Sequence, residues 1–148
     1  MATADELLRR HQLRVTAPRV AALEVLGERS HLTTDEVAKA VRERIGTLST
    51  QAGYHVLEAL VTVGLVRRIE PAGSPALYER RVGDNHHHLV CRSCAMVVDV
   101  DCHTDEGPCV ELPTAHGFEV DEAEVVFWGY CPTCSLRPQS SRTPEENR

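Results

Sequence analysis

Four of the six cysteines form two Cys-x-x-Cys pairs, Cys91 with Cys94 and Cys131 with Cys134. In each pair, two thiolates can hold one ion from a tight turn, and two such turns complete a tetrahedron. Four soft thiolates around an ion without redox chemistry favour zinc in a closed structural site. We therefore predict a structural Zn²⁺ at these four cysteines. Two redox dithiols, or unrelated buried cysteines, are the alternative interpretations.

Three consecutive histidines, at residues 86–88, run directly into the first cysteine pair. Alternate side chains of an extended segment point the same way, so His86 and His88 should share a face while His87 points away. Two imidazoles on one face have the geometry to hold one metal ion. The alternative interpretation of this triplet is a solvated polar hinge.

Such an ion needs further ligands, and three other residues can supply them. Glu79 ends a predicted strand just upstream, Asp99 ends the strand that follows the first cysteine pair, and His31 stands at the start of a predicted helix. If all of them converge with the two histidines, three imidazoles and two carboxylates surround the ion. That mixed set suits Fe²⁺, Mn²⁺ or Zn²⁺.

Polar side chains open a predicted helix that begins at Ser49 or Thr50. Hydroxyl and amide groups at a helix N-terminus can meet phosphates and base edges in the major groove of DNA. Arginines in the same half can reach the phosphate backbone, or they are ordinary surface residues. The residues predicted to contact DNA are Arg14, Arg19, Ser49, Thr50, Gln51, Tyr54 and Arg67.

The elements that would position these residues follow a definite order. Caps, glycines and apolar spacing predict four helices, over residues 4–11, from Thr16 to near Gly27, from Thr34 to Gly46, and from Ser49 or Thr50 to Gly64. Strands over 65–70 and 76–79 flank a turn at 71–75. Helices followed by such a hairpin are typical of the winged helix-turn-helix.

The second half is predicted to hold strands over 88–90, 96–100 and 125–128 and a helix over 109–116. The predicted fold is therefore α+β, with an N-terminal winged helix-turn-helix domain and a small C-terminal α/β dimerisation domain that carries the structural zinc. The predicted divisions are 1–82 for DNA binding, 83–87 for a hinge, 88–135 for dimerisation and metal binding, and 136–148 for a disordered tail.

The charge is unevenly distributed along the 148 residues, whose net charge is −6. Residues 1–83 hold 12 Lys and Arg against 10 Asp and Glu, a charge of +2, whereas residues 84–148 hold 4 against 12, a charge of −8. Only the first half is therefore expected to bind nucleic acid. No apolar run is long enough to span a membrane and no hydrophobic signal core is present, so we expect a cytoplasmic protein with reduced thiols and no membrane partner.

Two cysteines, Cys102 and Cys109, lie outside the pairs. They are interpreted either as small hydrophobic residues or as a thiol pair that oxidises under peroxide stress. Acidic neighbours such as Asp101 and Asp105 disfavour a reactive thiolate, which weakens the second interpretation.

Five segments together form a recognisable pattern: Arg14-Val15-Thr16-Ala17-Pro18-Arg19, Gly64-Leu65-Val66, Tyr78-Glu79, the run from His86 to Cys94, and the run from Trp128 to Cys134. Through these motifs the chain resembles, over roughly residues 7–134, the ferric uptake regulator (Fur) family, and in detail its FurA-type branch, which is associated with catalase-peroxidase genes. The order and spacing of the motifs together are highly specific.

The resemblance implies a homodimeric repressor, not an enzyme, that binds a double-stranded DNA operator when a regulatory metal is bound. It implies Fe²⁺ as that metal, with Mn²⁺ or Zn²⁺ as alternatives, beside the structural Zn²⁺. The regulatory ligands it implies are His31, Glu79, His86, His88 and Asp99. An ion joining His31 to the later ligands would close the hinge and space the two recognition helices for successive grooves.

The chain departs from the family's pattern at three places. Ala52-Gly53-Tyr54-His55 stands where the recognition helix usually reads Thr-Val-Tyr-Arg, and Ala123 replaces a histidine of a further metal site, which is therefore not predicted. The peroxide-sensing branch typically has an Asp where this chain has Glu79.

These departures leave several alternatives open. The chain could be a thiol-based redox-sensing repressor that uses Cys102 and Cys109, or a zinc-, nickel- or manganese-sensing member of the family. A zinc-dependent hydrolase is disfavoured because the sequence has no His-Glu-x-x-His-like motif.

Overall fold

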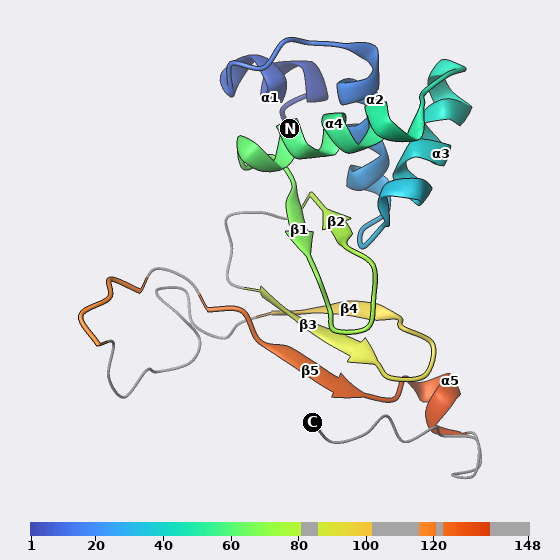
Figure 1. The fold of residues 1–148 in the computed structure, drawn as a ribbon, viewed down its shortest axis with the longest axis vertical. Helices are drawn as coiled ribbons and strands as arrows, with labels where there is room; N and C mark the ends of the chain where they lie inside the picture. Colours follow the sequence, from blue (N-terminus) through green and yellow to red (C-terminus); the bar gives the residue numbers. More distant parts are fainter. Residues whose placement is uncertain (81–85, 102–115, 121–122, 137–148) are drawn as a thin grey trace. The chain divides into compact units, whose positions relative to one another are not determined.

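A computed structural model describes residues 1–80, 86–101, 116–120 and 123–136. The chain divides into two compact units, Met1–Gly83 and Asp84–Arg148. The first unit contains α1 (Ala4–Arg10), α2 (Ala17–Glu28), α3 (Thr34–Ile45), α4 (Thr50–Thr62), β1 (Arg67–Ile69) and β2 (Leu77–Glu79). The second contains β3 (His86–Cys91), β4 (Val97–Asp101), β5 (Val126–Gly129) and α5 (Pro132–Ser135) (Figure 1).

The helices of the first unit begin at polar caps and pack around leucines. Thr33 and Ser49 cap α3 and α4 by accepting hydrogen bonds from backbone N–H groups inside the first turn. The predicted cap of α3, Thr34, is wrong by one residue, because Glu36 completes a capping box with Thr33 and leaves Thr34 as the first, buried helical residue. The largest fully buried apolar side chains of this unit, each at most 1% exposed, are Leu8, Leu23, Leu26, Leu57 and Leu60.

Helices α3 and α4 meet at a glycine. Gly53 is buried in α4, and a Cβ built on it would lie 3.2 Å from the Cβ of Ala38 in α3. A contact this short is tighter than carbon atoms prefer. The close approach of the two helices therefore depends on the missing side chain at Gly53.

The wing is a short antiparallel hairpin in which Arg67 pairs with Glu79 and Ile69 with Leu77. A third segment joins it, because the backbones of Leu32 and Tyr78 exchange two hydrogen bonds, of 3.2 and 2.8 Å. This bridge fixes the chain just before α3 against the end of β2.

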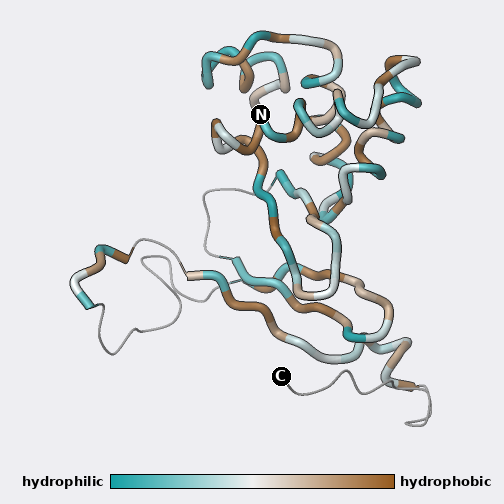
Figure 2. The backbone as a smooth tube through the Cα atoms, in the orientation of Figure 1, coloured by the Kyte–Doolittle hydropathy of each residue, from teal (hydrophilic) through white to brown (hydrophobic). Residues whose placement is uncertain are grey.

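The second unit is built on a three-stranded sheet with the order β4-β3-β5. β3 pairs antiparallel with β4 and parallel with β5. β3 begins at His86, so the last two residues of the predicted hinge, 86 and 87, lie within the strand. In Figure 2 hydrophobic stretches recur along these strands and along the helices of the first unit, with hydrophilic residues between them.

Three predictions fall outside the described residues: the helix over 109–116 except for its last residue, the tail after residue 136, and the pair Cys102 and Cys109. Among the helices in the described ranges, none has the length and apolarity to cross a membrane.

Candidate metal centres and nucleic-acid interface

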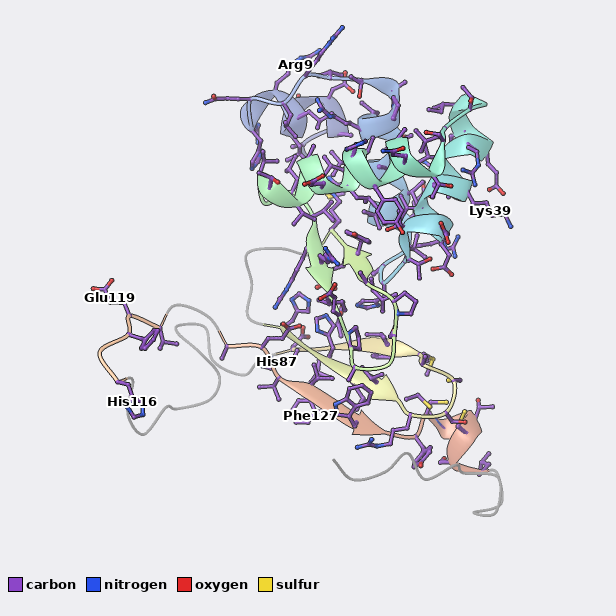
Figure 3. All side chains as sticks on the ribbon, in the orientation of Figure 1. Arg9, Lys39, His87, His116, Glu119 and Phe127 are labelled. Atoms are coloured by element: carbon purple, nitrogen blue, oxygen red, sulfur yellow. The ribbon has the colours of Figure 1, made fainter. Side chains whose placement is uncertain are left out.

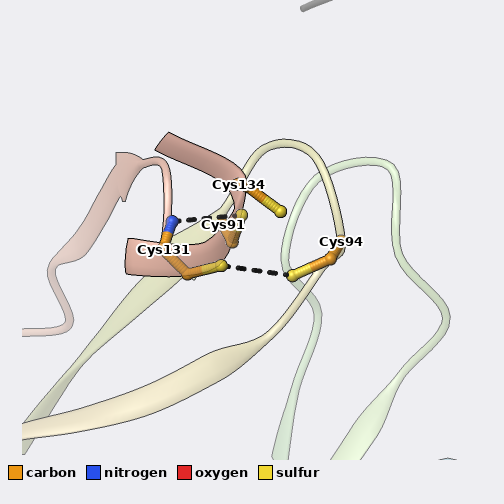
Figure 4. A group of neighbouring side chains, drawn as sticks. All are labelled: Cys91, Cys94, Cys131 and Cys134. Atoms are coloured by element: carbon orange, nitrogen blue, oxygen red, sulfur yellow. Dashed lines mark hydrogen bonds between the residues drawn. The ribbon is translucent and has the colours of Figure 1, made fainter. Parts of the chain in front are cut away.

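The four paired cysteines gather at one end of the second unit. Cys91 ends β3, Cys94 lies in the turn to β4, and Cys131 and Cys134 stand at the start of α5 and within it (Figure 4). Their sulfur atoms all lie within 4.8 Å of one another, and the Sγ atoms of Cys94 and Cys131 are 3.8 Å apart. Sulfurs on a tetrahedral Zn²⁺ with Zn–S bonds of about 2.3 Å lie about 3.8 Å apart, so this donor set fits zinc.

Backbone turns place the thiols. The N–H of Ala95 donates to the carbonyl of Cys91, and Ala95 takes a left-handed conformation with φ of 61°. On the other side, the N–H of Ser135 donates to the carbonyl of Cys131 at 2.8 Å. The guanidinium of Arg92 lies 5.4 Å from the ring centre of Trp128, in range for a cation–π contact that ties the first turn to β5.

The thiols of Cys91 and Cys94 differ in pKa. The backbone N–H of Cys131 donates to Cys91 Sγ at 3.3 Å, and this hydrogen bond is the main cause that lowers the pKa of Cys91 to about 6. A hydrogen bond from the N–H of Met96 lowers the pKa of Cys94, but Cys91 and the other thiols outweigh it and raise that pKa to about 11. A dication would remove this conflict, because it stabilises all four thiolates together.

Two histidines and one aspartate gather on the sheet of the second unit. Asp99 on β4 is directly opposite His88 on β3, and its Oδ1 lies 3.5 Å from His88 Nε2 and 3.8 Å from His86 Nε2. The two imidazole rings are 5.0 Å apart and both residues are buried, at 1% exposure. One carboxylate therefore faces the same nitrogen of two neighbouring imidazoles.

A second pair of candidate ligands lies within the first unit. His31 Nε2 is 3.1 Å from the Oε2 of Glu79, which ends β2 and is buried. The bridge between Leu32 and Tyr78 brings them together, and His31 takes a left-handed conformation with φ of 60°. Such a backbone is uncommon outside glycine, which points to a tightly determined position.

Ligand atoms around an ion at about 2.1 Å lie roughly 3 Å apart along an octahedral edge. The 3.1 Å pair fits this spacing, and the pairs at 3.5 and 3.8 Å need only a small contraction. Imidazole nitrogens and carboxylate oxygens are the donors that Fe²⁺, Mn²⁺ and Zn²⁺ accept.

Sequence reasoning missed the roles of two residues near this cluster. His87 on β3 (Figure 3) accepts a hydrogen bond at Nδ1 from the N–H of Val125 at 3.2 Å. Glu124 places its Oε1 3.6 Å from His88 Nδ1. The only signal for either role is the parallel pairing of β3 with β5, which no local pattern reveals.

The residues predicted to contact DNA lie in the first unit, and most are exposed. Thr50, Gln51 and Tyr54 are exposed on α4, while the Ser49 hydroxyl is engaged as the cap of that helix. Arg14 is also exposed.

Three other arginines of the first unit are partly covered. Arg67 and Arg19 are half-buried, and the Arg19 guanidinium donates to the Arg14 carbonyl at 2.8 Å. The guanidinium of Arg80, at the end of the wing, donates to the Leu23 carbonyl of α2. The exposed polar surface of α4 is therefore the best candidate to meet DNA.

Comparison with known proteins gives a consistent result. The model of the ferric uptake regulator family matches residues 10–128. The transcriptional regulator FurA of Mycobacterium tuberculosis is 52% identical over 139 residues, covering 94% of this chain and 95% of its own. Ferric uptake regulation protein 2 of Mycolicibacterium fortuitum is 49% identical, covering 92% and 97%.

Solved structures agree with this comparison. A ferric uptake regulator from Pseudomonas aeruginosa with manganese has a TM-score of 0.66 at 26% identity, over 88% of this chain and 99% of that one. A peroxide stress regulator from Campylobacter jejuni has a TM-score of 0.65 at 22% identity, over 90% and 100%.

Proposed function

Because the chain belongs to the ferric uptake regulator family, we propose that it is a DNA-binding transcriptional repressor whose affinity for its operator is set by one divalent metal ion. Members of the family are transcriptional regulators, and its solved relatives include a zinc uptake regulator complexed with zinc and DNA. A bacterial repressor acts where the chromosome lies, in the cytoplasm.

The observation that carries the proposal is the pair of buried imidazoles, His86 and His88, facing the carboxylate of Asp99. Two imidazoles buried beside a partly buried carboxylate are costly unless these groups are paired or hold a metal. The regulatory site then consists of these three residues together with His31 and Glu79. An ion that binds both groups of ligands couples the DNA-binding unit to the second unit.

This coupling supplies the switch. Metal binding favours the arrangement of the two units in which the α4 helices of a dimer fit successive half-sites. Allosteric couplings are typically about 1–3 kcal/mol, which corresponds to about 5- to 150-fold in affinity. The similarity to ferric uptake regulation proteins supports Fe²⁺ as the regulatory ion, with Mn²⁺ or Zn²⁺ as alternatives that the same imidazole and carboxylate donors accept, while the four cysteines hold a separate structural Zn²⁺.

A homodimer accounts for an exposed apolar row on the sheet of the second unit. Val98, Leu89 and Phe127 are paired across β4, β3 and β5, and they are 43–48% exposed. Apolar side chains grouped in this way mark an interaction surface. A second copy of the chain is the partner that an operator with two half-sites requires.

The targets are proposed to be oxidative-stress genes such as catalase-peroxidase genes, iron-homeostasis genes, or both. The similarity to mycobacterial FurA and ferric uptake regulation proteins supports this assignment. The alternative function, a thiol-based redox-sensing repressor that uses Cys102 and Cys109, stays a prediction, because both cysteines lie outside the described residues.

The test replaces one regulatory ligand and measures DNA binding. The probe is a duplex selected from a random library by the Mn²⁺-loaded wild-type protein. His86→Ala should lose the metal-dependent gain in affinity, which we expect to be about 5- to 150-fold, and should keep its zinc. His116→Ala, at an exposed turn of the same unit, is the matched control and should respond like the wild type. A full metal response in His86→Ala would show that the regulatory site is wrongly assigned.

A further inference from the structure

The imidazole of His88 lies between two carboxylates. Its Nε2 is 3.5 Å from Asp99 Oδ1, and its Nδ1 is 3.6 Å from Glu124 Oε1. The ring is buried, at 1% exposure, whereas the Glu124 side chain is 42% exposed. Both ring nitrogens are therefore directed toward acidic groups, although the regulatory site uses only the Nε2 side.

The sheet explains why Glu124 reaches this position. His88 is opposite Asp99 on β4 and opposite Val126 on β5. Glu124 lies two residues before Val126, the first residue of β5, and a chain that enters the strand in extended form brings it to the same face as His88.

Two hydrogen bonds fix the backbone beside Glu124. The N–H of His88 donates to the Val125 carbonyl at 3.2 Å, and the N–H of Val125 donates to His87 Nδ1, also at 3.2 Å. Glu124 therefore directly precedes a residue whose N–H and carbonyl groups are both hydrogen-bonded to β3.

We propose that Glu124 is a positioning residue that orients His88 for the regulatory metal, an inference that rests on the function proposed above. A metal-binding histidine usually gives its other ring N–H to a carboxylate, which fixes the tautomer and the ring orientation. With the N–H of Nδ1 directed at Glu124, the lone pair of Nε2 is directed at the side of Asp99 and His86, where the ion would bind.

The distance leaves room for this contact to tighten. A hydrogen bond between a ring nitrogen and a carboxylate is about 2.9 Å long, so the 3.6 Å separation exceeds it by about 0.7 Å. Because the Glu124 side chain is partly exposed, a small rotation is enough to close the gap while His88 stays in place. Glu124 acts through His88 and is not itself proposed as a ligand.

The experiment measures metal affinity directly, without DNA. Full-length, zinc-loaded protein is titrated with Mn²⁺ against a chelator dye, and Co²⁺ spectra report the ligand field of the same site. Glu124→Ala should weaken Mn²⁺ binding by about 10- to 100-fold and alter the Co²⁺ bands, because outer partners of metal ligands typically contribute that much. Glu124→Gln, which keeps the shape and an accepting oxygen, should lie between the wild type and Glu124→Ala.

Controls separate positioning from folding and from loss of charge. Glu119→Ala removes one carboxylate from an exposed position of the same unit and should bind Mn²⁺ within twofold of the wild type. Zinc content and the thermal midpoint before Mn²⁺ addition should be unchanged in all Glu124 variants.

The outcomes distinguish this proposal from the function on which it rests. If His88→Ala abolishes Mn²⁺ binding and Glu124→Ala stays within twofold of the wild type, the positioning role is refuted and the regulatory site stands. If His88→Ala keeps the wild-type affinity for Mn²⁺, the assignment of the regulatory site is wrong.

Discussion

The contact between α3 and α4 yields a quantitative prediction, because a Cβ at Gly53 would lie 3.2 Å from Ala38 Cβ. Gly53→Ala gains about 1 kcal/mol of helix propensity, and overpacking costs about 1–3 kcal/mol. We therefore expect this variant to lose about 1 kcal/mol of unfolding free energy. The usual preference for alanine over glycine inside a helix is reversed here, because the helices must part by a few tenths of an ångström.

The double-mutant cycle isolates the crowding. Ala38→Gly alone should cost about 2 kcal/mol, from about 1 kcal/mol of helix propensity and about 0.8 kcal/mol for one buried methyl. The double variant moves the methyl from one helix to the other, so its stability should lie within about 1 kcal/mol of the wild type, whereas additivity predicts a loss of about 3 kcal/mol.

Urea unfolding followed by circular dichroism at 222 nm is the assay, since the long helices among the described residues, α2, α3 and α4, all belong to the first unit. All variants are compared in their zinc-loaded form, so that differences in metal content do not enter. A coupling energy below about 0.5 kcal/mol would mean that the two sites are independent, and it would refute the account of the helix contact.

Two further predictions concern the cysteine site and the end of the wing. Because the pKa of Cys91 is lowered to about 6, this thiol is already ionised at pH 7.5, and Zn²⁺ binding should release fewer than four protons. Calorimetry in buffers of different ionisation enthalpy counts the released protons. A count of four would contradict the low pKa of Cys91. In the zinc-free protein, the stabilisation from that thiolate should be complete above pH 9 and lost as the pH falls toward 6, which chemical unfolding at several pH values checks. A Cβ at Gly27 would lie 2.8 Å from the Arg80 guanidinium, whose flexible end can move aside. Gly27→Ala should therefore change the free energy of unfolding by less than about 1 kcal/mol, because the gain in helix propensity offsets the lost hydrogen bond from Arg80 to the Leu23 carbonyl. A loss above about 2 kcal/mol in urea unfolding would show that the Arg80 side chain cannot move aside.

The local elements of the first unit could be predicted from the sequence because their signals are local. Gly46 follows α3 with φ of 91°, a conformation that glycine adopts without strain, and it ends the helix where expected. The one-residue error at the start of α3 arose because residues 33 and 34 are both threonines. Only the reciprocal bond with Glu36 distinguishes the cap, and it depends on the exact register.

The four-cysteine site was also within reach of sequence analysis. Each Cys-x-x-Cys pair forms a local turn, and one shared ion can bind the four thiolates of two such turns. The position of α5 was not predicted, although Pro132 at its first turn is a favourable start for a helix.

What the sequence could not provide is the neighbour of β3 on its second side. Parallel pairing with β5 joins residues nearly 40 positions apart in the chain, as Val125 and His87 are. Pairings over such distances are set by the packed sheet and not by local preference. Glu124 was missed for this reason, since nothing in its own neighbourhood connects it with a histidine.

The alternation of a single strand explains how three identical residues come to have different tasks. His86 and His88 share one face of β3 and direct Nε2 toward Asp99. His87, on the opposite face, accepts the N–H of Val125, so its proton must reside on Nε2 and its Nδ1 is not available to a metal. His87 therefore does not bind the ion but holds the backbone next to Glu124, whose carboxylate faces His88. Slipping β3 by one residue would exchange these tasks, which ties metal binding to the register of the whole sheet.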